Sequence, residues 1–150
     1  MKSKLYPLSF LLILFLLSSC KKWLPENRIV GSWKVTNAEK RRFLTKELIL
    51  TGYENGVFNF YENGTASFTD TTGSMTGNWS MRKVDGGYYD ADGNWQSNSR
   101  TDLLIKLFNF NTNRYIEWYF DNIDFRSSGY QLTGFIYGAN YNYRYYFRKQ

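Results

Sequence analysis

Short runs of β-branched and aromatic residues recur along this chain, and clusters of Gly, Asn and Asp separate them. Apolar and polar residues alternate within several runs. In the run 114–120, for example, Ile116, Trp118 and Phe120 fall on one face and the residues between them on the other. A period of two turns one face of a strand toward a core and the other toward water. Long stretches of helix formers are sparse, so the pattern predicts an all-β protein.

The runs define eight expected strands, which are 32–38, 56–61, 65–69, 75–84, 101–110, 114–125, 130–137 and 141–149. The segment 43–50 is either a ninth strand or a short helical crossover, because periodicity does not separate the two. Asn63-Gly64 is a strong hairpin signal, since both central positions of a type I′ turn require positive φ. Consecutive hairpins give an up-and-down meander, and closing it into a barrel removes unpaired edges. We therefore expect a single eight-stranded antiparallel up-and-down barrel over residues 29–150.

Residues 1–19 have the arrangement of a secretory signal peptide. Lys2 and Lys4 precede a mainly apolar run, residues 8–17, and two small Ser residues lead to Cys20. About ten residues at a rise of 1.5 Å cover only about half of a ~30 Å bilayer core. The segment is therefore expected to be an export signal and not a permanent transmembrane helix.

The residues Leu-Ser-Ser-Cys at 17–20 resemble the lipobox of bacterial lipoproteins, in which a signal peptidase cleaves before the Cys and the thiol carries diacylglycerol. Cys20 is the only Cys in the chain. The resemblance implies an acylated Cys20 and a tether over residues 20–28, which reaches at most about 25–30 Å when extended. Lys21 after the Cys implies forwarding to the outer membrane, and we expect the periplasmic face because no acidic run follows. The alternative is an ordinary secretory signal with an incidental Cys.

Four segments resemble the lipocalin-like domains of bacterial lipoproteins. Residues 28–35, Arg-Ile-Val-Gly-Ser-Trp-Lys-Val, look like the Gly-x-Trp motif that opens the first lipocalin strand. Residues 60–65 look like the Asn-Gly hairpin of that family, 76–80 like its recurrent Gly-x-Trp strand, and 147–149 like its basic, aromatic last strand. The resemblance implies a lipocalin-like barrel that is anchored to a membrane.

The same resemblance implies a structural pair of Trp33 and Arg148. In a closed meander the first and last strands run antiparallel, so the start of one lies beside the end of the other. Lipocalins place an Arg of the last strand over this indole, a cation–π contact worth about 0.5–2 kcal/mol. Arg144 is the alternative partner, about 13 Å back along the strand. A further alternative is that Trp33 is a core aromatic and Arg148 a solvated charge. The pair is expected to close the barrel and not to bind ligand.

Two functions fit such a barrel. The first is capture of a small hydrophobic molecule, because eight strands enclose either packed side chains or one small ligand. Candidate lining residues, which could equally be ordinary core, are Phe58, Phe60, Phe68, Trp79, Trp118, Phe120, Tyr143 and Tyr145. The second is a solid-cored interaction module that docks to an envelope protein or glycan through the loop 85–100. There Tyr88, Tyr89 and Trp95 stand among Asp and Asn residues.

Composition argues against catalysis and metal binding. The chain has no His and one Cys, which excludes Ser-His-Asp and Cys-His catalysis, imidazole-ligated metals and an intrachain disulfide. Glu117, Asp121 and Asp124 form the densest acidic group on one expected strand, but Glu117 falls opposite the apolar face. We therefore expect neither an enzyme nor a cofactor. The run 90–94, Asp-Ala-Asp-Gly-Asn, lacks EF-hand spacing and is interpreted as a turn.

The basic residues are dispersed, although Lys plus Arg outnumber Asp plus Glu by 19 to 13. Nucleic-acid binding usually requires a clustered basic face, so we do not expect it. The triplet Lys-Arg-Arg at 40–42 is interpreted as a solvated turn or a membrane-facing patch. The expected partners are therefore a membrane, a small hydrophobic ligand or an unidentified envelope protein, and the protein is expected to be a monomer.

Overall fold

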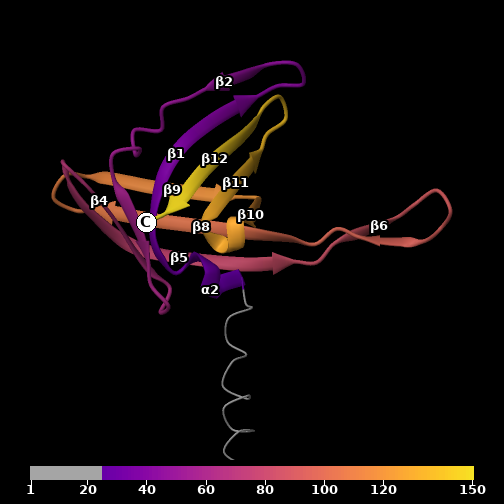
Figure 1. Ribbon diagram of the computed structural model, residues 1–150, viewed down its shortest axis with the longest axis horizontal. Helices are drawn as coiled ribbons and strands as arrows, with labels where there is room; N and C mark the ends of the chain where they lie inside the picture. The colour runs from indigo at the N-terminus through magenta and orange to yellow at the C-terminus, as the bar shows by residue number, and fades with distance from the viewer. Residues whose placement is uncertain (1–24) are drawn as a thin grey trace, which may run out of the picture.

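A computed structural model describes residues 25–150, and most of them lie in strands (Figure 1). The predicted signal peptide and Cys20 lie outside the described residues. The chain forms α2 (Pro25–Ile29), β1 (Gly31–Arg41), β2 (Lys46–Leu48), β3 (Val57–Phe60), β4 (Thr65–Asp70), β5 (Gly73–Val84), β6 (Gly87–Tyr89), β7 (Trp95–Ser97), β8 (Arg100–Asn109), β9 (Arg114–Phe120), β10 (Asn122–Arg126), the 3₁₀ turn η2 (Ser127–Gly129), β11 (Gln131–Tyr137) and β12 (Asn142–Lys149). The predicted all-β class is confirmed.

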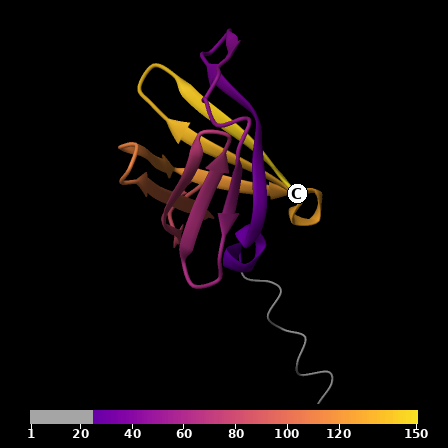
Figure 2. The same ribbon diagram turned by 90° about the vertical axis from the view of Figure 1, so that its left-hand side faces the viewer.

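One antiparallel sheet of ten strands makes up the body of the protein. Its order is β10-β11-β12-β1-β3-β4-β5-β8-β9, and β2 pairs with β1 outside this path. Figure 2 shows the sheet curling, and β1 pairs with β12 on one edge and with β3 on the other. The strands at the two ends of the order, β9 and β10, do not pair with each other. The main-chain hydrogen bonds therefore define an open sheet and do not close it into a ring.

The expected strand 114–125 is divided because its backbone changes partner at Asp121. β9 pairs with β8 before this residue, and β10 pairs with β11 after it. The Asp121 N–H donates to the Phe135 carbonyl oxygen at 2.8 Å. The Thr101 N–H donates to Oδ1 of Asn122 at 3.2 Å, which links the start of β8 to β10. The two ends of the sheet are therefore joined through one continuous stretch of chain.

The inner face of the sheet carries the hydrophobic core. Ile116 and Phe120 of β9 are buried, and Trp118 between them is half-buried. Tyr115 and Tyr119 on the other face are exposed, as the period of two predicted. Other fully buried side chains of the core are Ile29, Trp33, Val35, Phe58, Phe60, Phe68, Met75, Leu103, Ile105 and Leu132. Large aromatic rings thus fill much of the interior.

The β3–β4 hairpin has the predicted pairing but a different turn. Phe58 lies opposite Phe68, and Phe60 lies opposite Ala66. Four residues, 61–64, connect the strands, and among them only Gly64 adopts positive φ, at 80°. The Asn63 side chain accepts a hydrogen bond from the Thr65 N–H at 3.0 Å instead of occupying a type I′ position.

The structure also shows which elements form in the segments 43–50 and 85–100 and at the end of the expected tether. The ambiguous segment 43–50 contains β2, so it is a strand and not a helical crossover. The expected loop 85–100 contains a second sheet, in which β6 pairs with β7. The last part of the expected tether lies in α2, and Ile29 at the end of that helix is fully buried.

Trp33 closes the core at the end of the sheet beside α2. Its indole is fully buried, and its Nε1 donates to the Ile29 carbonyl oxygen at 2.6 Å. Nζ of Lys149 lies 5.4 Å from the centre of the indole and 3.3 Å from the Arg28 carbonyl oxygen. The cation–π partner is therefore a lysine of the last strand.

The sequence expectation named Arg148 as this partner, and the structure places Lys149 there instead. In the register of β1 and β12, Trp33 lies opposite Lys149 and Lys34 lies opposite Arg148. Directly opposed residues share a face, so Lys149 faces the core and Arg148 faces outward. The alternative partner, Arg144, lies over the Phe135 ring at 5.4 Å.

Candidate functional site

The eight residues expected to line a ligand cavity lie on the inner face of the sheet, where most of them pack against one another. Phe58, Phe60, Phe68, Trp79 and Phe120 are buried members of the core, and Trp118 and Tyr145 pack against it. Tyr143 is half-buried on β12. Ring centres lie 4.6 Å apart for Phe58 and Phe68 and 5.2 Å apart for Trp118 and Tyr145. These rings contribute to the core of the described protein.

Tyr53, which sequence analysis did not single out, covers the core at the end away from α2. It comes from the segment between β2 and β3. Its ring centre lies 5.3 Å from those of Phe68 and Trp118 and 6.4 Å from that of Phe58. A tyrosine in a Gly- and Asn-rich connection gave no periodic signal, so the sequence pattern could not assign it to the core.

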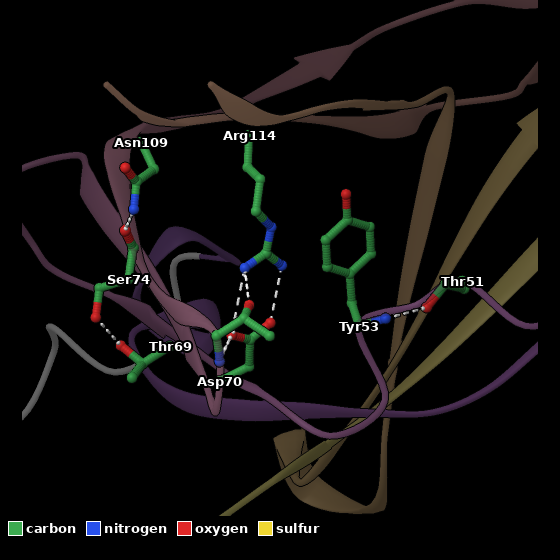
Figure 3. Close-up of polar contacts among 8 residues, drawn as sticks. Thr51, Tyr53, Thr69, Asp70, Ser74, Asn109 and Arg114 are labelled. Carbon is green, nitrogen blue, oxygen red and sulfur yellow. Dashed lines mark hydrogen bonds and ion pairs between the residues drawn. The ribbon is translucent and has the colours of Figure 1, made fainter. Parts of the chain in front are cut away.

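An ion pair beside Tyr53 joins the β4–β5 turn to the start of β9 (Figure 3). Nη2 of Arg114 lies 2.8 Å from Oδ2 of Asp70, and Nη1 lies 3.4 Å from Oδ1. Thr72 donates its N–H and its hydroxyl to Oδ1 at 2.7 and 2.6 Å. Hydrogen bonds from Arg114 and Thr72 hold the pKa of Asp70 well below its usual range. Both carboxylate oxygens are occupied, so this cluster acts as a structural clamp.

Two more carboxylates are buried on the outer side of the sheet, and each has cationic neighbours. Glu39 lies 2.7 Å from Nε of Arg41 and 2.7 Å from Nζ of Lys46. Burial raises the pKa of Glu39, but the hydrogen bonds from Lys46 and Arg41 outweigh it and leave the pKa below its ordinary value. Glu39 borders an outer groove of about 400 Å³ over β1, β11 and β12.

Asp102 is the second of these carboxylates. Its Oδ2 accepts hydrogen bonds from the Tyr119 hydroxyl at 2.6 Å and from Arg82 at 3.0 Å. Its Oδ1 accepts no hydrogen bond, but Nε of Arg100 lies 3.3 Å away. Burial raises the pKa of Asp102, and the bonds from Tyr119 and Arg82 outweigh that effect and lower it. Both carboxylates are thus held ionised in ion pairs.

The acidic group named from the sequence does not converge on one site. Glu117 pairs with Lys106 at 2.7 Å, and Asp124 pairs with Arg126 at 2.9 Å. Asp121 accepts a hydrogen bond from the Tyr137 N–H at 2.8 Å. Within residues 25–150, no cluster of three or more potential acidic, Cys or His ligands is placed to hold a metal ion.

The β6–β7 hairpin projects from the body of the protein as a narrow arm (Figure 1). Tyr89 lies opposite Trp95, and Tyr88 lies opposite Gln96. The Tyr89 and Trp95 rings share one face, with centres 5.1 Å apart, and remain 70% and 57% exposed. Tyr88 points to the other face because successive strand residues alternate. The arm therefore presents a pair of aromatic rings to solvent.

Backbone geometry fixes the position of Trp95. A Cβ added at Gly87 would overlap the Trp95 indole and lie 2.5 Å from the Gln96 carbonyl oxygen. The indole thus lies over a glycine, which leaves space for it across the pair of strands. Trp95 is held against the arm's backbone and does not extend freely into water.

Asp90 organises the turn at the tip of the arm. Its Oδ1 accepts the N–H groups of Asp92 at 3.0 Å and Asn94 at 2.9 Å, and its Oδ2 accepts a bond from the Gln96 amide at 2.7 Å. The bond from Gln96, with those from the backbone, lowers the pKa of Asp90. Gly93 adopts φ of 80° in the same turn. Asp90 thus stabilises a turn, which is the structure that the sequence predicted for the run 90–94.

Among the described residues, no helix has the length and apolar character needed to cross a bilayer. Comparisons of the chain with protein-family models, with curated proteins and with solved structures find no match. The lipocalin-like resemblance therefore remains a prediction from the motifs. Among the features of the described residues, the exposed ring pair on the β6–β7 arm is the strongest indication of function.

Proposed function

We propose that this protein is a membrane-anchored, solid-cored β-barrel lipoprotein that binds a glycan of the cell envelope through its β6–β7 arm. The observation that carries the proposal is the pair of exposed rings, Tyr89 and Trp95, on one face of the arm. A small-molecule pocket would require the rings of the core to move apart. An arm that carries exposed aromatic rings on a filled body is instead suited to surface binding.

The chemistry of the arm favours a sugar ligand. Sugar rings have apolar C–H faces that stack on indole and phenol rings, while their hydroxyls bond to carboxylates and amides. The turn beside Trp95 contains Asp92 and Asn94, and Gln96 follows on β7. The internal bonds of Asp90 hold this turn in one conformation, which reduces the entropy lost on binding.

Retention of the purified protein on insoluble envelope glycan tests the proposal. Trp95→Ala and Tyr89→Ala should each lower the affinity by roughly 10-fold, because one aromatic contact contributes about 0.5–1.5 kcal/mol beyond its buried area. Tyr88→Ala is the matched control, since this ring faces the other side of the arm. Unchanged retention of both ring variants would refute the proposal. Retention only on envelope protein would replace the glycan with a protein partner.

A small hydrophobic ligand is the second candidate function. It is favoured by a half-buried aromatic group in which Trp118 touches both Tyr53 and Tyr145, with ring centres 5.3 and 5.2 Å apart. Titration with a hydrophobic fluorophore tests it. Saturable binding that quenches Trp fluorescence and weakens in Trp118→Phe would support capture at this group. An absence of saturable binding would leave the arm as the functional surface.

Two structural elements complete the proposal. The first is closure of the sheet into a lipocalin-like barrel, which is supported by the continuity of β9 and β10 through Asp121. The second is acylation of Cys20 and attachment to the periplasmic face of the outer membrane, which is supported by the lipobox-like residues 17–20. Metabolic labelling with a palmitate analogue should mark the natural chain and not Cys20→Ser. Labelling of both chains would exclude Cys20 as the acylated residue.

A further inference from the structure

The turn of the β1–β2 hairpin and the segment from the end of β2 onward carry bulky apolar side chains that no other described residue covers. Phe43 is 98% exposed and Leu50 is 92% exposed, and Leu44 and Leu48 are also largely in water. Phe43 and Leu44 lie in the turn itself, which projects from the body at the end away from α2 (Figure 1). Soluble surfaces seldom gather large apolar groups in this way without a contact that uses them.

Turn chemistry does not account for these residues. Tight hairpin turns favour Gly, Asn and Asp at their central positions. Here Phe43 and Leu44 stand there, between Arg42 and Thr45, whose N–H and C=O groups form a hydrogen bond of 2.9 Å. Neither central residue has positive φ. The β3–β4 turn, by contrast, follows the usual preference with Gly64. The apolar tip departs from local preference, which is typical of functional positions.

Basic residues surround the apolar tip. The segment 39–47 contains Lys40, Arg41, Arg42 and Lys46 against Glu39 and Glu47, four positive charges less two negative, or +2. Glu39 is buried between Arg41 and Lys46 and offsets part of their charge. The segment keeps its net charge of +2, and Lys40 and Arg42 are its two cations that do not pair with Glu39.

A tyrosine from the neighbouring β11–β12 turn joins this surface. Nζ of Lys40 lies 4.0 Å from the centre of the Tyr141 ring, and the Arg42 guanidinium lies 4.7 Å from it. Arg42 also donates to the Tyr141 hydroxyl at 2.9 Å. Together, phenylalanine and leucine at the tip with tyrosine and cations behind them form the layered composition that suits a membrane interface.

We propose that the β1–β2 tip inserts into an anionic lipid surface, with Phe43 and Leu44 among the acyl chains and Lys40 and Arg42 at the headgroups. A bilayer accepts a projecting point without a matching pocket, whereas a protein partner would have to supply one. Anionic headgroups also complement the basic residues around the tip. This contact is independent of acylation at Cys20.

The position of the tip determines how the body would lie. β1 has 11 residues and spans about 35 Å at roughly 3.3 Å per residue, with α2 at its start and the tip at its end. A chain held to the same membrane near α2 would therefore contact the surface at both ends of β1. The barrel would lie along the membrane and not stand upright on it.

A fluorophore sensitive to polarity tests the proposal in the full chain. Cys20→Ser removes the natural thiol, and Leu44→Cys or Phe110→Cys supplies one labelling site. Phe110 is the matched control because it is also in a turn and is similarly exposed. We expect a blue shift at position 44 on vesicles of equal phosphatidylcholine and phosphatidylglycerol, a much smaller shift on phosphatidylcholine alone, and none at position 110.

Charge reversal provides the second measurement. Arg42→Glu in the Leu44→Cys chain should abolish most of the shift on anionic vesicles, whereas Lys83→Glu, the same change at a distant exposed residue, should not. Identical emission at positions 44 and 110 on anionic vesicles would overturn the proposal. A shift at position 44 that appears without vesicles and grows with protein concentration would also overturn it, by showing that a second copy covers the tip.

Discussion

Lys149 is a charged residue that lies at the end of the core and has specific partners there. Its ammonium lies 5.4 Å from the centre of the Trp33 ring and donates to the Arg28 carbonyl oxygen. Burial lowers the pKa of Lys149, because partial desolvation disfavours the charged form. The cation–π contact and the hydrogen bond compensate part of that cost. Arg148, one residue earlier, is exposed and has no contact with the indole.

Replacing these two cations separately tests that assignment. Lys149→Ala should lower the free energy of unfolding by about 1 kcal/mol, through loss of the contact with Trp33 and of the bond to Arg28. Arg148→Ala should change it by less than about 0.5 kcal/mol, as is usual for exposed residues. Denaturant unfolding followed by Trp fluorescence measures both. A larger effect at Arg148 would restore the sequence expectation.

The clamp between Asp70 and Arg114 should make stability depend on pH. A carboxyl whose pKa is lowered by folding contributes stability above its ordinary pKa, near 4, and loses that contribution as pH falls through the lower folded value. Asp70→Asn should therefore cost on the order of 1–3 kcal/mol at pH 7 and progressively less below about pH 4. Unfolding midpoints across this pH range measure it. Asp124→Asn, in a more exposed pair, is the control, and an equal cost at every pH would contradict the ion-pair account.

At the scale of elements, long alternating runs were predictable and short or partner-dependent strands were not. The faces of β9 followed from a period of two, and the β3–β4 pairing followed from Asn63-Gly64. β6 and β7 have three residues each and sit among glycines, so they carry no periodic signal. They form a separate sheet beyond the β5–β8 pair, and the bond from the Asn98 N–H to the Gly86 carbonyl oxygen at 2.8 Å lies between the two pairings. The candidate aromatic residues were thus identified, but not their placement on a hairpin.

A change in the β6–β7 arm should alter binding without changing the stability of the body. Gly87→Ala places a methyl group where the Trp95 indole and the Gln96 carbonyl lie, and the ring is the group that can move. We expect a changed near-UV circular dichroism signal and roughly 10-fold weaker glycan retention, as for loss of the ring contact itself. The unfolding midpoint should stay nearly constant, because β6 and β7 form a sheet of their own. A large fall in the midpoint would instead make the arm part of the folding unit.

At the scale of the molecule, the central question is how a sheet with an open order of strands avoids two exposed edges. The free edges of β9 and β10 belong to one stretch of chain that bends at Asp121. Bonds at this bend reach to β11 on one side and to β8 on the other. The alternation shifts by one residue at the bend, because Ile116 and Phe120 face the core in β9 whereas Ile123 faces it in β10. The expectation of one strand over 114–125 did not take this shift into account. Closure of the sheet at the Asp121 bend would protect the edges of β9 and β10 from pairing with other chains, and no additional strand would be needed.

Hydrogen exchange distinguishes a closed body from an open one. If the bend closes the barrel, the Asp121 amide, bonded to Phe135, should exchange as slowly as the amides within β5 and β8, since all would open only in global unfolding. The Asn98 amide, bonded to Gly86 at the base of the arm, is the internal control and should exchange faster. Asn122→Ala should speed exchange at Thr101 and leave the Asp121 amide protected. Fast exchange at Asp121 in the natural chain would mean that the sheet opens at this edge, and a closed barrel would have to be abandoned.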